Sequence, residues 1–166
     1  MFDLKPLSKD AVGRALEKAE RYRLLNEPAE AESICEDVLK VDPGNQQAEI
    51  TLLLALTDQF EEALGEKAAE ALQVAERLRD GYPRAYYAGI VSERRAKALR
   101  KRGSIGASQA AYGSFLDAMR WFEKAEALRP AGNDDALLRW NACARILDRN
   151  PSLTAPPADS PELPLE

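Results

Sequence analysis

Apolar and small residues recur along most of the chain at intervals of three and four, with charged residues between them. This spacing places them on one face of a helix and predicts a series of amphipathic helices. Three of these helices share one pattern, in which a proline follows twelve residues after an alanine and marks where the helix must have ended. The three copies run from Ala31 to Pro43, from Ala71 to Pro83 and from Ala118 to Pro130.

Another apolar helix precedes each of these copies, so the pattern predicts three helical hairpins over residues 12–45, 46–85 and 86–132. Residues 1–9 form a short arm, and Asp10 is expected to cap the first helix. The spacing between successive prolines grows from 40 to 47 residues, which predicts hairpins that lengthen by about one turn on each helix. A further helix at 133–149 is expected to cover the last hairpin.

The first helix of the third hairpin has two possible registers. Strict counting from the proline gives a poor set of packing positions: Gly89, Ser92, Glu93 and Ala96. A shift of about one residue gives a more apolar stripe: Tyr87, Ile90, Val91 and Ala98. We favour the second set as the buried face because an apolar stripe is the stronger helix signal.

The alanine, apolar and proline positions resemble those of the second helix of the tetratricopeptide repeat. The first copy also fits the 34-residue length of that repeat, and it matches at Ala19, Tyr22, Ala31 and Pro43. The resemblance covers about residues 11–148. It implies an all-α fold of about seven helices, in which three repeats and a capping helix form a right-handed superhelical stack of antiparallel hairpins.

The same resemblance implies a binding surface, because this family binds peptides or helices in a concave groove lined by the first helix of each repeat. The repeat count places ten residues on that surface: Leu16, Glu20, Arg23, Ile50, Leu54, Asp58, Tyr87, Ile90, Arg94 and Lys97. We therefore expect a non-catalytic scaffold or adaptor that binds a segment of a partner protein. The alternative is a structural subunit that forms homo-oligomers through the same surface.

Composition fits a single helical domain of 166 residues, with 45% hydrophobic and 31% charged residues. A net charge of −5 argues against general binding to nucleic acid or to an anionic membrane. The N-terminal residues lack the apolar core of a secretory signal, and no apolar stretch approaches the roughly 18 residues that span a bilayer. We expect a cytoplasmic protein without membrane insertion.

Catalytic chemistry finds little support in the sequence. Histidine is absent, which removes the commonest general base and the commonest metal ligand. Cys35 and Cys143 lie far apart and match neither a disulfide framework nor a zinc motif, so we interpret both as buried packing residues. We expect no enzymatic activity, no catalytic residue, no cofactor and no metal.

One charge cluster stands out in this acidic chain, with six bases between residues 94 and 102: Arg94, Arg95, Lys97, Arg100, Lys101 and Arg102. Such a cluster could bind phosphates or an acidic peptide. The alternative, which we favour, is that these bases complement a helix C-terminus and keep it soluble. An acidic run in the second hairpin is expected to face the cluster and to neutralise part of it: Asp58, Glu61, Glu62, Glu66 and Glu70.

The last segment, residues 151–166, has five prolines and three acids and is expected to be disordered. Pro161 and Pro164 have the spacing of a polyproline ligand, but the segment lacks the usual basic residue. A further alternative is that this tail folds back into the groove.

Overall fold

The computed structural model of the chain describes residues 2–153 and residue 155. These residues form an all-α fold in which seven α-helices follow a short 3-10 helix, η1, at Lys9–Ala11. The α-helices are α1 (Val12–Leu24), α2 (Pro28–Val41), α3 (Gln46–Asp58), α4 (Phe60–Arg77), α5 (Gly81–Arg102), α6 (Ala107–Ala127) and α7 (Asp135–Arg149).

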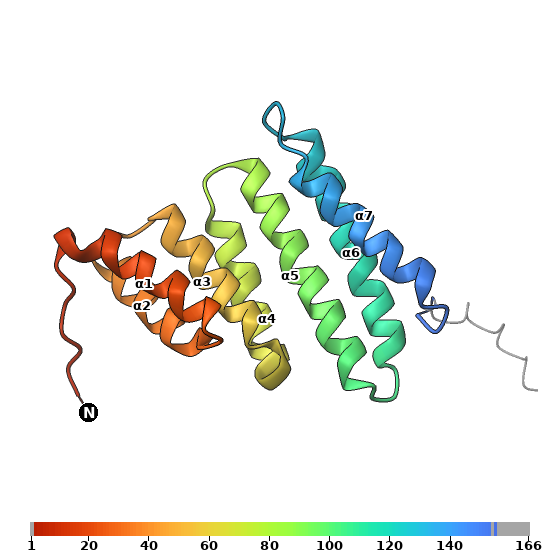
Figure 1. The fold of residues 1–166 in the computed structure, drawn as a ribbon, viewed down its shortest axis with the longest axis horizontal. Coiled ribbons are helices and arrows are strands. Elements are labelled where there is room, and N and C mark those ends of the chain that lie inside the picture. The colour runs from red at the N-terminus through yellow and green to blue at the C-terminus, as the bar shows by residue number, and fades with distance from the viewer. Residues whose placement is uncertain (1, 154, 156–166) are drawn as a thin grey trace, which may run out of the picture.

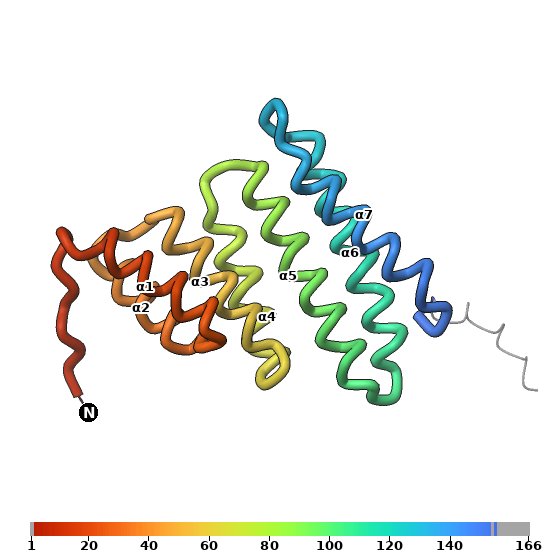
Figure 2. The backbone as a smooth tube through the Cα atoms, viewed as in Figure 1, coloured from red at the N-terminus to blue at the C-terminus, as the bar shows by residue number. Residues whose placement is uncertain are grey.

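Each helix packs against the next one along the chain, so the molecule is a row of consecutive hairpins with α1 and α2 at one end and α7 at the other (Figure 1). The backbone trace runs up and down in alternation as it crosses the molecule (Figure 2). The first helices of neighbouring hairpins also meet, because α1 contacts α3 and α3 contacts α5. This arrangement confirms the predicted stack of helical hairpins.

Residues with defined roles set the ends of several helices. Pro28 occupies the first turn of α2, where its missing N–H costs nothing, and Asn26 before it has a φ of 60°. Asn45 caps α3 by accepting a hydrogen bond from the backbone N–H of Ala48 at 2.9 Å. Gly103 and Gly106 both have a left-handed backbone and bound the turn between α5 and α6.

Asp10 does not cap a helix, contrary to our expectation. The chain instead enters α1 through η1, where the N–H of Ala11 donates to the carbonyl of Ser8 at 3.0 Å. The 3-10 turn therefore leads directly into the α-helix, and no side chain is needed at that point.

The hairpins lengthen along the chain as predicted, from 13 and 14 residues to 13 and 18, and then to 22 and 21. The prediction of one added turn on each helix is wrong, because α3 is no longer than α1. The extra residues of the second hairpin lie in α4, whose first turn is set off from the rest by the non-helical backbone of Ala63.

Two large hydrophobic clusters fill the stack, and opposite faces of α5 contribute to both. The N-terminal core joins α1 to α5 and takes Ala88, Val91 and Ala98 from α5. The C-terminal core joins α5, α6 and α7 and takes Ala85, Ile90 and Ala96. The packing role that we predicted for α7 is confirmed, since Ala136 and Cys143 are buried in that core.

Both registers considered for α5 are therefore partly right. Gly89, Glu93 and Ala96, which we set aside as a poor core, are buried together with Ile90 and Val91. The helix is enclosed on two sides, so its buried surface is broader than one stripe. Among the described residues, no helix is long and apolar enough to cross a membrane.

Candidate functional site

A groove runs across the first helices of the three hairpins. It encloses a volume of about 520 Å³, and α1, α3 and α5 all contribute to its lining. The lining residues are Glu20, Arg23, Leu24, Gln47, Ile50, Thr51, Leu54 and Tyr87. Five of the ten residues predicted for a partner-binding surface are among them: Glu20, Arg23, Ile50, Leu54 and Tyr87.

Two predicted residues, Leu16 and Ile90, do not reach the groove because they are buried, with exposed fractions of 3% and 2%. Leu16 packs with Val38 of α2 and Ala48 of α3, and Ile90 belongs to the C-terminal core. The repeat count assigned these two residues to the groove wrongly. The reason is that α1 and α5 each pack a broad apolar face against the adjoining helices.

The lining of the groove combines apolar and polar side chains. Leu24 is 88% exposed, and Ile50, Leu54 and Tyr87 are partly exposed beside it. Gln47 donates to Glu20 Oε1 at 3.3 Å and closes one edge. Burial, with smaller contributions from Tyr86, Tyr82 and Asp135, raises the pKa of Tyr87, so its phenol is neutral at physiological pH. An exposed apolar strip with polar edges fits one side of an amphipathic segment.

A three-helix ion-pair network lies beside the groove and is centred on Asp58 of α3. Arg23 Nε of α1 donates to Asp58 Oδ2 at 2.7 Å, and Arg94 of α5 donates to Asp58 Oδ1. Arg94 also donates to Thr57 Oγ1 at 2.9 Å. The network joins the first helices of all three hairpins, so its role is to hold these helices together.

Three of the six bases in the basic cluster on α5 are paired with carboxylates: Arg94, Lys97 and Lys101. Lys97 pairs with Glu93, and Lys101 Nζ lies 2.6 Å from Glu61 Oε1. Arg102 donates weakly to the backbone carbonyls of Phe60 and Glu61, at 3.5 and 3.4 Å.

The expected pairing of the basic cluster with the acidic run is confirmed at Asp58 and at Glu61. It does not extend to Glu70, whose carboxylate faces Lys67 of its own helix. Within the described part of the chain, Arg95 and Arg100 form no ion pair.

Glu93 of α5 is a buried carboxylate that contacts α7. Its side chain is fully enclosed, and its Oε1 accepts from Lys97 and from Arg139 Nη1, the latter at 3.4 Å. Its Oε2 has no hydrogen-bond partner among the described residues. Lys97 belongs to α5, like Glu93, whereas Arg139 belongs to α7. The contact of Glu93 with Arg139 therefore joins α5 to α7, and we call Glu93 the anchor between these helices.

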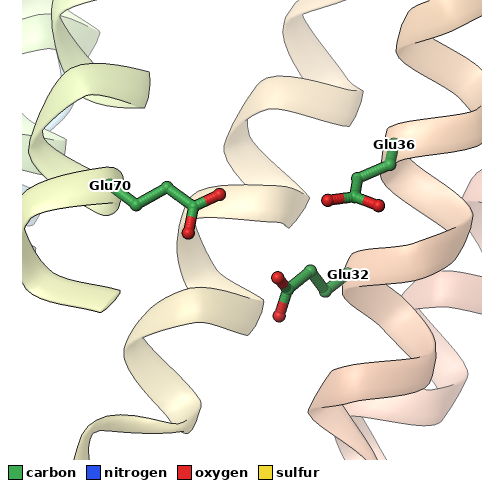
Figure 3. A group of neighbouring side chains, drawn as sticks. All are labelled: Glu32, Glu36 and Glu70. Atoms are coloured by element: carbon green, nitrogen blue, oxygen red, sulfur yellow. The ribbon is translucent and has the colours of Figure 1, made fainter. Parts of the chain in front are cut away.

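Three glutamates from two hairpins gather on the second helices, where Glu32 and Glu36 of α2 point toward Glu70 of α4 (Figure 3). Lys67 supplies positive charge there, since its Nζ lies 2.6 Å from Glu32 Oε1 and 4.0 Å from Glu70 Oε2. Burial lowers the pKa of Lys67, but the hydrogen bond and charge of Glu32, with the charges of Glu70 and Glu66, together raise it above its usual value. The group is a structural salt bridge between hairpins, and the sequence did not indicate it.

Two arginines missed by the sequence analysis, Arg145 and Arg149 of α7, lie with Arg100 in a second cleft of about 410 Å³. Their spacing of four residues places both on one helix face. That spacing was visible in the sequence, but we had interpreted the helix only as a cover.

The two thiols offer no nucleophile. Cys35 and Cys143 are free and buried, as predicted, and burial raises the pKa of each to about 12. A protonated thiol is a poor nucleophile and a poor metal ligand.

Comparison with protein-family models, with curated proteins and with solved structures gives no match to this chain.

Proposed function

We propose that this protein is a non-catalytic scaffold that binds one amphipathic segment of a partner protein, helical or extended, in the groove across α1, α3 and α5. The observation that carries the proposal is the apolar strip of Leu24, Ile50, Leu54 and Tyr87, drawn from three consecutive hairpins. Leu24 is 88% exposed, although it is a leucine and lines the groove. A partner with apolar side chains would remove this strip from water.

The resemblance to tetratricopeptide repeats supports this proposal. Seven helices packed as consecutive hairpins are what such a repeat protein would form, and its partners bind on the first helices. We propose that the chain is a divergent protein of this type, with a cytoplasmic location and no cofactor.

The test is selection of binding peptides from a displayed library on the immobilised full chain, followed by affinity measurements on variants. Leu24→Glu and Ile50→Glu place a charge in the groove, and we expect each to weaken the selected peptides at least tenfold. Leu138→Glu is the matched control, because Leu138 is 61% exposed on α7, outside the groove. The selected peptides should carry apolar residues at helical or alternating spacing. Equal binding to all three variants would refute the proposal.

Self-association is a second candidate, favoured by a different observation. Leu24 and Leu25 are adjacent and both largely exposed, in the first hairpin of the stack. A second copy that covered them would give a dimer. Light scattering over a hundredfold dilution distinguishes the two candidates, because a stable dimer that Leu25→Glu converts to monomer supports self-association, and a constant monomer mass excludes it.

A further inference from the structure

The cleft between the C-terminal halves of α5 and α7 is lined by three arginines and no acid. Arg100 comes from α5, Arg145 and Arg149 come from α7, and Ala142, Ile146 and Asn150 complete the lining. We call this the arginine cleft. Its volume of about 410 Å³ falls within the range of roughly 300–1,000 Å³ that is typical of ligand sites.

The arginine cleft differs from the rest of the basic surface in its lack of partners. Nearby on α5, Arg94, Lys97 and Lys101 each have a carboxylate partner. Within the described residues, the three cleft arginines have no carboxylate within the 4.0 Å that defines an ion pair.

The favourable interaction of arginines with helix C-termini explains the positions of only two of the three cleft arginines. Arg100 and Arg149 occupy the last turns of their helices, where a base is favourable. Arg145 lies a turn earlier on the same face of α7 as Arg149. Three guanidinium groups from two helices therefore share one cleft, and their mutual repulsion would be relieved by a bound anion.

We propose that the arginine cleft binds an acidic peptide segment of a partner protein, through carboxylates that engage the three guanidinium groups. Guanidinium and carboxylate groups match as forks and form strong, charge-assisted hydrogen bonds. Ala142 and Ile146 add apolar side chains to the lining of the cleft, which suits the methylene groups of glutamate side chains or an apolar neighbour. This site is separate from the groove and does not depend on the function proposed for it.

A peptide fits these features better than a nucleic acid. The lining holds no aromatic side chain on which a base could stack. The whole chain carries a net charge of −5, which would repel a long polyanion beyond the cleft. A short segment with two or three carboxylates would contact only the positively charged cleft, and not the negatively charged surface beyond it.

The test is a fluorescence-anisotropy titration of the full chain with a fluorescein-labelled hexapeptide of alternating glutamate and alanine. We expect saturable binding that weakens as salt is raised, and at least a tenfold loss in the double variant Arg100→Ala/Arg145→Ala. The control is Arg14→Ala/Arg21→Ala, which removes the same charge from two exposed arginines of α1 at the other end of the stack. It should bind the peptide within about twofold of the parent, and all variants should keep the parent Tm.

Four results with the parent chain and the arginine variants would overturn the proposal. They are no binding by the parent, an equal loss in both double variants, equal binding of the peptide with glutamine in place of glutamate, and tighter binding of a single-stranded oligonucleotide of similar charge. A further variant tests the acids of the chain's own last segment, Asp159→Asn/Glu162→Gln/Glu166→Gln. If it binds the peptide tenfold more tightly than the parent, the chain's own acids already occupy the cleft and the proposed partner is wrong.

Discussion

Gly89 of α5 lies directly against the ring of Phe122 of α6, so closely that a methyl group on Gly89 would come within 2.5 Å of the ring. Both residues are buried in the most extensive helix–helix interface of the molecule. Because Phe122 is fully enclosed, its ring has no room to move aside. Gly89 is thus the residue that allows the two longest helices to pack closely.

We predict that Gly89→Ala destabilises the fold. Overpacking in a core typically costs about 1–3 kcal/mol, and the better helix propensity of alanine returns about 1 kcal/mol, which leaves a net loss of up to about 2 kcal/mol. Urea unfolding followed by circular dichroism measures this. Gly113→Ala in α6 is the matched control, because a methyl group there would contact nothing within 4 Å, and it should stabilise the protein. Equal effects from the two substitutions would contradict the packing argument.

Removal of the Asp58 carboxylate should loosen the attachment of α1 and α5 to α3. Asp58→Asn is expected to lower the free energy of unfolding by about 1–2 kcal/mol, because both carboxylate oxygens accept from partly buried arginines. The comparison is Asp117→Asn, which breaks an exposed pair with Arg120 and should cost less than about 0.5 kcal/mol. If the two variants lose the same stability, the network does not contribute as proposed.

Glu93→Gln tests the buried anchor between α5 and α7. We expect a loss of about 1–3 kcal/mol, the usual range for a buried hydrogen bond to a charged group. The loss should stay below the 3–5 kcal/mol typical of a broken, fully buried ion pair, because Lys97 and Arg139 are 46% and 41% exposed and can be solvated. Glu123→Gln, which alters an exposed hydrogen bond from Trp140, is the control and should have little effect. A stability equal to that of the parent would show that Glu93 is not an anchor.

The thiols of Cys35 and Cys143 should resist alkylation at pH 8 in the folded protein and react after unfolding. Burial raises the pKa of each from 9.0 to about 12, so the folded state retains protons that the unfolded state releases. The resulting stabilisation is complete below pH 9 and is lost as the pH rises toward 12. The double variant Cys35→Ala/Cys143→Ala should therefore lose less stability than the parent between pH 9 and 12. Rapid alkylation of the native parent would contradict this prediction.

The sequence was most informative where a local rule applies. A proline cannot continue a helix into its interior, so Pro43 and Pro130 marked the ends of α2 and α6 to within three residues. Pro83 was less exact, because it lies in the first turn of α5, six residues after the end of α4. Gly103 and Gly106 follow a local rule of the same kind, because both adopt a left-handed backbone that glycine permits at no steric cost.

Features that depend on rotation about a helix axis could not be predicted in full. Leu16 and Ile90 were placed in the groove by counting, yet each faces a core instead. Glu93 was set aside as part of a poor set of packing positions, yet it is buried and paired with Lys97 one turn away and with Arg139, 46 positions later in the chain. The arginine cleft was missed for a related reason, since its lining comes from two separate helices.

The position of α5 between two cores has a consequence for how the stack comes apart. One face of α5 belongs to the N-terminal core and the other to the C-terminal core, so this helix is shared by both halves. In a linear array each unit is stabilised only by its neighbours, and the uncovered end frays first. The short α1–α2 hairpin can therefore open and re-form while α5, α6 and α7 remain folded. Part of the groove lies on that hairpin, so a partner that bound there would also slow the exchange of its amide hydrogens.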